Sequence, residues 1–252
     1  MVIRPGIELA NLSDTGTTRT ENEDYYCYAE PASDEEFRKK GRLAIVADGM
    51  GGHAGGQVAS GIAVDQVRQV YLDHPADEPQ EALVAAFREA HAAILDYARE
   101  HPELRGMGTT CTVAVVRDSD LFFGHVGDSR LYLIRDGSIS RVTQDHSLVG
   151  RMVREGLLTP EEAAVHPDRN VLTAALGMES AVPIEVSEEP MPLATGDTLL
   201  ICTDGLHGLV SDEEMGSIAC SHTPTQACRE LVRIANERGG FDNITVEILK
   251  LL

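Results

Sequence analysis

The chain has 252 residues, of which 42% are apolar and 25% are charged, and its formal net charge at pH 7 is −20. This composition is typical of a globular protein that is long enough for one large domain or two small ones. A surface this acidic repels nucleic acid and anionic lipid, so we expect neither nucleic acid nor a membrane as a partner.

Two helices are expected in the first half of the chain, at 55–73 and 80–100, because apolar residues recur there at intervals of three and four. Pro79 and the pair His101-Pro102 mark the limits of the second helix. Asp136-Gly137 is a strong signal for a hairpin turn. The strands expected around these features are 6–14, 24–30, 41–48, 110–117, 120–127, 130–135 and 138–142.

Residues 146–180 break this rhythm, because they are polar, contain several prolines and glycines, and hold only short helical pieces at 147–155 and 160–164. We interpret them as a lid-like insertion beside a functional site. Strands are expected again at 182–188, 197–203 and 244–250, with helices at 211–221 and 224–238. Hairpins in sequence and helices in pairs predict an α+β protein whose antiparallel sheets are covered by helices.

Aspartates stand at the ends of several predicted strands. Asp48 and Asp204 each end an apolar run and precede a glycine, Asp128 ends a third run, and Asp242 stands just before the last strand. In antiparallel sheets the start of one strand lies beside the end of its neighbour, so these carboxylates can meet. A single Asp-Gly pair usually marks a turn, but clustered carboxylates without His or Cys partners select Mg²⁺ or Mn²⁺.

A metal ion held by carboxylates can polarise a phosphoryl oxygen and lower the pKa of bound water, and two ions about 3.5–4 Å apart can bridge the attacking hydroxide. Gly49 and Gly205 are small neighbours that let ions and substrate approach, and the Gly49 carbonyl can act as another oxygen ligand. Arg19 lies in a polar stretch before a strand and can bind phosphate through two N–H groups. Taken alone, Arg19 is more typical of a surface residue.

Six short motifs together resemble the metal-dependent protein phosphatases of the PPM (type 2C) family in its compact bacterial form. The resemblance runs from about residue 8 to residue 250, and the motifs stand in the order of the family. They are Arg19-x-x-Asn22-Glu23-Asp24, Ala47-Asp48-Gly49-Met50-Gly51-Gly52-His53, Gly108-Thr109-Thr110, Gly127-Asp128-Ser129-Arg130, Thr203-Asp204-Gly205 and Asp242-Asn243-Ile244-Thr245.

The resemblance implies a four-layer α-β-β-α sandwich in which residues 1–252 form a single catalytic domain and 146–180 form a flap. It implies hydrolysis of phosphoserine and phosphothreonine in proteins by a water activated on a binuclear Mn²⁺ or Mg²⁺ centre, with proteins of Ser/Thr kinase pathways as substrates. The implied ion contacts are Asp48 as the bridge, Asp204 and Asp242 on one ion, the Gly49 carbonyl on the other, Glu23 and Asp24 on its waters, and Asp128 on a third ion. Arg19 matches the phosphate-binding arginine of the family.

One departure from the family and one open role concern individual residues. Bacterial relatives usually carry an arginine where this chain has Ala174, which affects flap docking or substrate contacts and leaves the metal centre intact. His53 titrates near neutrality and is a candidate general acid, but a structural role is the more common one for such a residue, and a metal-bound water can do the same work. His91 and His125 are expected to be packing or surface residues.

Other functional classes share parts of these patterns. Cys111-x5-Arg117 matches the bare motif of cysteine-dependent phosphatases, but a β-rich run without glycine separates the two residues. The segment 49–54 imitates a dinucleotide-binding loop without the parallel strands that should follow, and the Asp-x-Asp of an aspartyl-phosphate mechanism is absent. A non-catalytic module that binds phosphoproteins on the same fold remains the alternative function.

The five cysteines form no Cys-x-x-Cys pair, and Cys111, Cys202 and Cys220 lie in apolar runs, so we expect them to be buried. The N-terminus lacks the layout of a signal peptide, and no apolar run approaches the roughly 18 residues that span a bilayer. These features predict a reduced, cytoplasmic protein.

Overall fold

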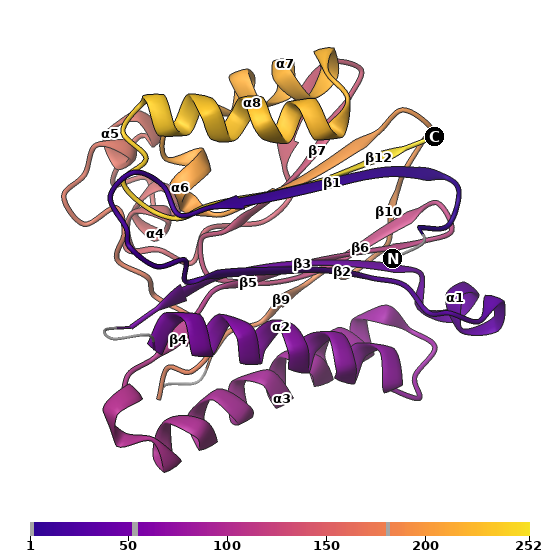
Figure 1. Ribbon diagram of the computed structural model, residues 1–252, viewed down its shortest axis with the longest axis horizontal. Helices are drawn as coiled ribbons and strands as arrows, with labels where there is room; N and C mark the ends of the chain where they lie inside the picture. Colours follow the sequence, from indigo (N-terminus) through magenta and orange to yellow (C-terminus); the bar gives the residue numbers. More distant parts are fainter. Residues whose placement is uncertain (1–2, 52–54, 180–181) are drawn as a thin grey trace.

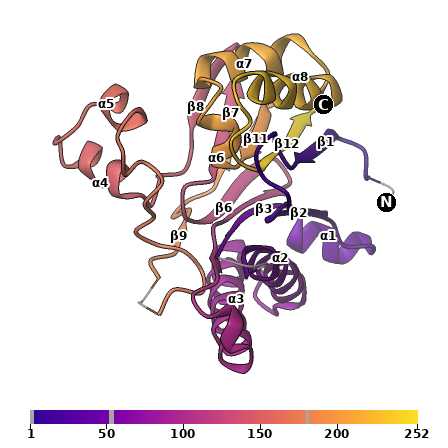
Figure 2. The same ribbon diagram turned by 60° about the vertical axis from the view of Figure 1, so that its left-hand side comes forward.

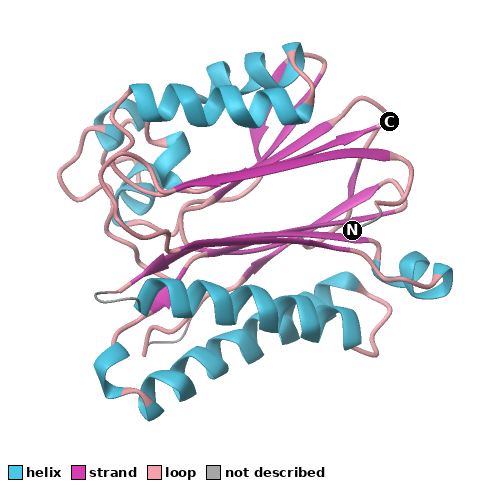
Figure 3. Ribbon diagram, in the orientation of Figure 1, coloured by secondary structure: helices cyan, strands magenta, loops and turns pink. Residues whose placement is uncertain are grey.

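Two antiparallel sheets lie face to face in the computed structural model, and helices cover the outer face of each sheet (Figure 1). The structure describes residues 3–51, 55–179 and 182–252. Figure 3 shows the resulting four layers as helices, sheet, sheet and helices. The α+β architecture predicted from the sequence is therefore confirmed.

The first sheet has five strands in the order β1-β12-β11-β7-β8. Its strands are β1 (Ile7–Asp14), β12 (Ile244–Leu251), β11 (Thr198–Cys202), β7 (Arg130–Arg135) and β8 (Ser138–Arg141). Cys202 pairs with Val246 in the antiparallel register of β11 and β12. The end of β11 and the start of β12 therefore lie at the same edge of the sheet.

The second sheet has seven strands, five of which follow the order β10-β6-β5-β3-β2. Its strands are β2 (Asp24–Ala29), β3 (Arg42–Met50), β5 (Cys111–Arg117), β6 (Asp120–Val126) and β10 (Met191–Pro192), with β4 (Gly108–Thr109) on β3 and β9 (Glu185–Val186) on β6. Asp24 and Asp48 are direct partners in the register of β2 and β3. The start of β2 and the end of β3 therefore lie at the same end of the second sheet.

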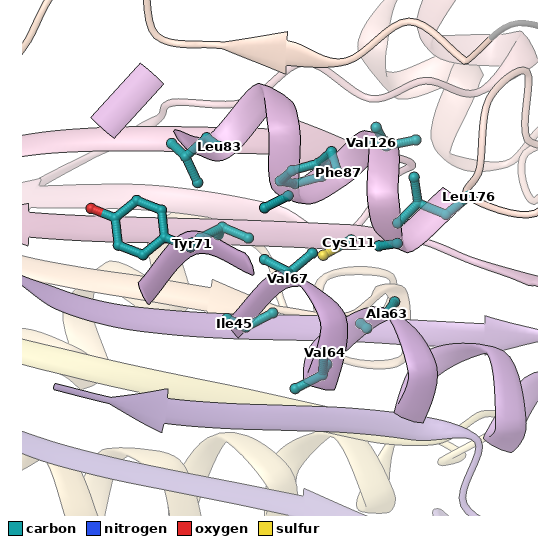
Figure 4. Close-up of a cluster of buried hydrophobic side chains, with 14 of the residues drawn as sticks. Ile45, Ala63, Val64, Val67, Tyr71, Leu83, Phe87, Cys111, Val126 and Leu176 are labelled. Carbon is teal, nitrogen blue, oxygen red and sulfur yellow. The ribbon is translucent and has the colours of Figure 1, made fainter. Parts of the chain in front are cut away.

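Helices α2 (Gly55–Asp73) and α3 (Pro79–Glu100) cover the second sheet, and α7 (Asp212–Ser221) and α8 (Pro224–Glu237) cover the first. On α2, Ala59, Ala63, Val67 and Tyr71 are fully buried, which is the spacing of one helical face. Figure 4 shows side chains of α2, α3, β3 and β5 packed in the cluster that joins this helix pair to its sheet. Both helix pairs thus hold their sheets through continuous apolar clusters.

The 146–180 segment contains α4 (Leu148–Arg154) and α5 (Pro160–Ala164), in agreement with the two short helices expected there. Both helices lie to one side of the sandwich (Figure 2). Thr159 accepts a hydrogen bond from the Glu162 amide, and the Glu162 carboxylate accepts one from the Thr159 amide. This capping box fixes the start of α5 in a helix of only five residues.

Several expectations differ from the structure. The strand expected at 182–188 is much shorter in the structure, because only Glu185–Val186 pairs with β6, while Val182 and Ile184 pack against the helix-side core. Cys220 is exposed, whereas Cys111 and Cys202 are buried as expected. Sequence patterns also gave no signal for the short elements α1 (Asp34–Lys40), η1 (Pro102–Leu104), α6 (Asp204–His207), β4 and β10. Within the described ranges, no helix has both the length and the apolar character needed to cross a membrane.

Candidate metal centre

The aspartates that the sequence places at strand ends come together at one edge of the sandwich. Asp204 is the first residue of α6, directly after β11 and Thr203, and Asp242 lies two residues before β12. Asp48 lies near the end of β3 in the opposite sheet, and its carboxyl is close enough to Asp204 to interact with it electrostatically. Asp128 follows β6 and is close enough to act electrostatically on Asp48. The structure therefore gathers four carboxylates from four distant parts of the chain.

Asp24 ties the two sheets together at this edge. Its Oδ2 atom accepts hydrogen bonds from the Thr203 hydroxyl at 3.0 Å and from the Thr245 hydroxyl at 2.6 Å. Thr245 belongs to β12 of the first sheet and Thr203 directly follows β11 of that sheet, whereas Asp24 belongs to the second sheet. The other oxygen, Oδ1, is buried and has no hydrogen-bond partner among the described residues. A buried carboxylate oxygen without a partner is costly, and a cation or an ordered water would satisfy it.

The electrostatics of this edge are those of an uncompensated acidic cluster. The surrounding protein shields the Asp48 carboxyl from water, and repulsion by Asp24 and Asp204 adds to this, so the Asp48 pKa is raised well above its usual value. Burial also raises the pKa of Asp24 to about 7, against the two threonine hydrogen bonds that lower it. For Asp128 and Asp204, burial and then neighbouring carboxylates raise the pKa as well. The cluster therefore needs either protons or cations.

Two of these carboxylates are buried, and the other three are only partly exposed, so the surrounding protein still shields them from bulk water. Asp24 and Asp128 are 6% and 8% exposed, whereas Asp48, Asp204 and Asp242 are partly exposed. Ions can therefore reach the three partly exposed carboxylates from solvent, while the two buried carboxylates lie behind them.

Arg19 is the cation of this edge. Its Nη2 atom donates to Oδ2 of Asp242 at 2.8 Å, and its side chain is 48% exposed. Partial burial lowers the Arg19 pKa, but the charge and hydrogen bond of Asp242, followed by the charges of Glu23 and Asp48, raise it further. The guanidinium is thus charged, exposed and adjacent to the carboxylate cluster.

Glu23 and Gly49 occupy the base of the site. The Glu23 amide donates to Oδ1 of Asn243 at 2.8 Å, and its carbonyl accepts from the Gly49 amide at 3.2 Å. Burial raises the Glu23 pKa, while Arg19 and the Gly56 amide lower it. A Cβ on Gly49 would collide with the carbonyl oxygen of Gly56. The small size of Gly49 therefore serves close backbone packing, as does that of Gly205, whose added Cβ would collide with the Asn243 carbonyl oxygen. This role differs from the ion access expected from the sequence.

Three hydrogen-bonding residues at this edge were missed by sequence reasoning. Nε2 of His207 on α6 donates to the Asp128 carbonyl at 3.0 Å, and burial lowers the His207 pKa to about 3, so this imidazole is neutral. Thr203 and Thr245 hold Asp24 as described above. The sequence offered a signal only for the threonines, because Thr203 and Thr245 each belong to a quoted motif that assigned them no role, whereas His207 lies in none of the motifs.

Other sequence-level expectations have mixed outcomes. His53 lies outside the described residues, so its role stays a prediction. Ala174, where relatives usually have arginine, is 2% exposed and packs in the helix-side apolar cluster. His125 is fully buried, and His91 accepts a hydrogen bond from the Gly177 amide; both therefore have packing roles, as expected. Cys111 and Arg117 stand at the two ends of β5, and burial raises the Cys111 pKa, which excludes the thiolate that a cysteine phosphatase needs.

A histidine-containing group near the cluster does not have the character of a metal site. His125, His146 and Glu185 have ligand atoms within 4.8 Å of one another, and no other such group of three occurs in the described ranges. Nε2 of His125 faces two backbone carbonyls, at 3.0 and 3.1 Å, so it carries the proton. Nδ1 of His125 faces the Thr112 hydroxyl, and Nδ1 of His146 accepts from the Gly127 amide. These hydrogen bonds already use the lone pairs that a metal requires.

The aspartate cluster, in contrast, fits hard divalent ions. It offers only oxygen donors, its pKa shifts reflect missing positive charge, and Asp24 Oδ1 lacks a partner. Carboxylate and carbonyl oxygens are the ligands that Mg²⁺ and Mn²⁺ prefer. Its carboxylates are more widely spaced than the histidine group, which suits ligands shared between two ions and waters.

Comparisons with known proteins identify the family of the chain. A family model described as protein phosphatase 2C matches residues 30–240. Protein phosphatase PhpP of Streptococcus pneumoniae is 36% identical over 249 residues, which cover 97% of this chain and 98% of PhpP.

Two solved structures extend the likeness to the fold. The serine/threonine phosphatase of S. agalactiae has a TM-score of 0.88 and 31% identity, and the match covers 98% of this chain and all of that one (100%). The catalytic domain of the phosphatase PstP, in complex with two manganese ions, has a TM-score of 0.84 and 33% identity, with 98% and 99% covered. The resemblance read from the six motifs is confirmed, and the chain is an enzyme of the protein phosphatase 2C family.

Proposed function

We propose that this chain hydrolyses phosphoserine and phosphothreonine in proteins, using Mn²⁺ or Mg²⁺ bound by the aspartate cluster. Residues 1–252 act as one catalytic domain, and the 146–180 segment is the flap beside its site. The named relatives are serine/threonine or protein phosphatases, and one solved relative holds two manganese ions. Phosphorylated proteins of Ser/Thr kinase pathways are the substrates, and the cytoplasm is the compartment.

The observation that carries this proposal is the meeting of Asp48, Asp204 and Asp242 beside Arg19. Three carboxylates from three separate segments supply the oxygen ligands, and one exposed guanidinium supplies the counter-charge for a phosphoryl group. Asp128 adds a further carboxylate for a third, weaker ion. Glu23, Asp24 and the Gly49 carbonyl complete the oxygen donors at the base of the site.

The reaction is the displacement of a serine or threonine oxygen by water. The water oxygen bonds to phosphorus, the P–O bond to the side-chain oxygen breaks, and one proton passes to that leaving oxygen. Bound ions supply activation of the water and neutralise phosphoryl charge. His53 is the candidate that delivers the proton, and no phosphoenzyme forms.

Arg19 orients the phosphoryl group before attack. Among the described residues only Asp242 accepts a hydrogen bond from it, so its remaining N–H groups are available to phosphoryl oxygens. A guanidinium presents five donors in a fixed plane, which matches the geometry of phosphate. Its half-exposed position lets a phosphorylated side chain reach it from solvent.

The alternative, a non-catalytic module that binds phosphoproteins, requires the loss of a metal ligand, and all four aspartates are present. The test is phosphate release from a phosphothreonine peptide and from a small aryl phosphate by the EDTA-treated chain, with and without added Mn²⁺. We expect turnover of both substrates that depends on Mn²⁺ and is abolished by Asp204→Asn. Binding of the phosphopeptide without release of phosphate would support the alternative and overturn the proposal.

A further inference from the structure

His146 grips a single residue next to the aspartate cluster through two hydrogen bonds. Its backbone amide donates to the Gly127 carbonyl at 2.7 Å, and its Nδ1 atom accepts from the Gly127 amide at 3.2 Å. His146 is the first residue of the 146–180 segment, and Gly127 directly precedes Asp128. The 146–180 segment therefore hydrogen-bonds to both the amide and the carbonyl of Gly127, the residue directly before Asp128.

Gly127 is closely packed on the side away from this contact. Its φ of +111° favours glycine, and a Cβ at this position would lie 2.5 Å from the Thr110 side chain. Thr110 in turn accepts a hydrogen bond from the Asp48 amide at 2.9 Å. The Gly127 backbone thus lies between Thr110, which hydrogen-bonds to the Asp48 amide, on one side and His146 on the other.

A second histidine, His125, also hydrogen-bonds to Gly127 from inside the sandwich. Nε2 of His125 donates to the carbonyls of Gly127 and Gln144, and its ring centroid lies 5.0 Å from that of His146. Because Nδ1 of His125 faces the Thr112 hydroxyl at 2.9 Å, the ring is fixed at both nitrogens. The start of the 146–180 segment is therefore docked on a rigid base.

His146 also joins the two ends of the segment. Its carbonyl accepts from the Thr173 amide at 2.8 Å, and the neighbouring Leu148 amide donates to the Val171 carbonyl at 2.7 Å. A displacement of the returning chain near Thr173 would therefore pull on His146, and through it on Gly127. The contact forms a direct mechanical path from α4 and α5 to the Asp128 backbone.

We propose that His146 is a positioning residue that couples the 146–180 segment to Asp128, holding the Gly127 backbone so that the Asp128 carboxylate faces the aspartate cluster. The link to catalysis rests on the function proposed above. Coupling of this kind is reciprocal. An ion bound at Asp128 will order the 146–180 segment, and a loosened segment will weaken binding of that ion.

The experiment compares the parental chain, four single variants and one double variant by hydrogen exchange and by calorimetric titration with Mn²⁺. His146→Leu keeps the bulk of the side chain and removes the acceptor, whereas His146→Asn places an amide oxygen near the position of Nδ1. His166→Asn is the matched control, because Nδ1 of His166 also accepts from a backbone amide, that of Asp168 at 3.1 Å, but within the segment. Asp128→Ala marks the Mn²⁺ binding step that depends on Asp128.

We expect His146→Leu to speed exchange of peptides covering 146–173 and the Gly127 amide by roughly tenfold, since a buried donor loses its acceptor. It should weaken the same Mn²⁺ step as Asp128→Ala, and the double variant should be no weaker than Asp128→Ala alone. His146→Asn should restore both readouts toward the parental values, and His166→Asn should change neither.

The proposal would be overturned if His146→Leu exchanged hydrogen at the parental rate. It would also be overturned if the losses of Mn²⁺ affinity in His146→Leu and Asp128→Ala simply added in the double variant. Failure of His146→Asn to restore either readout would also count against it, because the loss would then reflect general damage. A parental protein that bound no Mn²⁺ would overturn the proposed function instead. In that case the exchange of the Leu and Asn variants would still decide whether His146 holds Gly127.

Discussion

Arg19 and Asp242 form an ion pair in which Nη2 of the arginine lies 2.8 Å from Oδ2 of the aspartate. The residue expected to bind phosphate thus already contacts a residue expected to bind metal. If Asp242 held an ion as proposed, that ion would compete with Arg19 for the carboxylate and would leave the guanidinium available for a phosphoryl group. The pair would then link metal occupancy to substrate binding.

Arg19→Ala should raise KM for phosphate substrates by roughly ten- to a hundredfold, the range for losing a charged hydrogen bond, with a smaller effect on kcat. Steady-state kinetics on an aryl phosphate at saturating Mn²⁺ measures both constants. Arg233→Ala is the control, since Arg233 is similarly exposed and paired with Glu230 and Glu237 on α8. An unchanged KM in Arg19→Ala would remove the phosphate-binding role.

Asp204→Asn and Asp242→Asn should each lose Mn²⁺ affinity and at least about a hundredfold of turnover, because removal of a ligand charge weakens the ion and its effect on water. Calorimetry measures the affinity independently of activity. Asp197→Asn is the matched control: Asp197 is a buried aspartate at the opposite end of β11, paired with Arg135. Near-parental turnover in either active-site variant at saturating Mn²⁺ would contradict the ligand assignment.

The metal-free protein should become less stable as the pH rises from about 4 to about 7. Burial raises the Asp24 pKa to about 7 in the folded protein, above its value of about 3.9 in an unfolded chain. A raised carboxyl pKa stabilises the fold below the unfolded pKa, and this contribution is lost as pH rises through the folded pKa. Urea denaturation in EDTA at pH 4.5 and pH 7.5 measures the change.

Asp24→Asn should reduce this pH dependence without abolishing it, since burial also raises the pKa of Asp48, Asp128 and Asp204. Saturating Mn²⁺ should reduce it in the parental protein. Metal-free protein that is equally stable at both pH values, or more stable at the higher one, would show that the acidic cluster carries no such strain.

Cys111→Ala should retain turnover while lowering stability by about 1 kcal/mol, a typical cost of a single substitution. Cys111 is fully buried within the apolar cluster of Figure 4, and burial raises its thiol pKa. Aryl phosphate kinetics and thermal unfolding measure the two effects. A loss of turnover that matched Asp204→Asn would revive the cysteine mechanism.

The sequence predicted the layered architecture well, because long elements carry strong patterns. Helix α2 was expected at 55–73 and observed at Gly55–Asp73, since its apolar face repeats over many turns. Strand β11 is a continuous buried run, and the turn Asp136-Gly137 adopts positive φ at both residues. The strand expected at 182–188 was predicted too long, because the extent of a strand depends on the neighbour with which it pairs, and only Glu185–Val186 pairs with β6.

The carboxylates of the candidate site could be picked out from the sequence, whereas the histidines that hold the backbone around them could not. Asp48, Asp204 and Asp242 stand in motifs with fixed neighbours, and strand-end placement gave a reason for them to meet. His207, His125 and His146 act through hydrogen bonds to backbone groups. Such contacts depend on the path of the chain, so no local pattern announces them.

The most direct test of the central claim is anomalous diffraction from crystals of the chain soaked in Mn²⁺. The account predicts two strong manganese peaks at the edge where β3, β11 and β12 meet, with carboxylate oxygens of Asp48, Asp204 and Asp242 as ligands. An edge without manganese, with these three carboxylates turned away from one another, would contradict it.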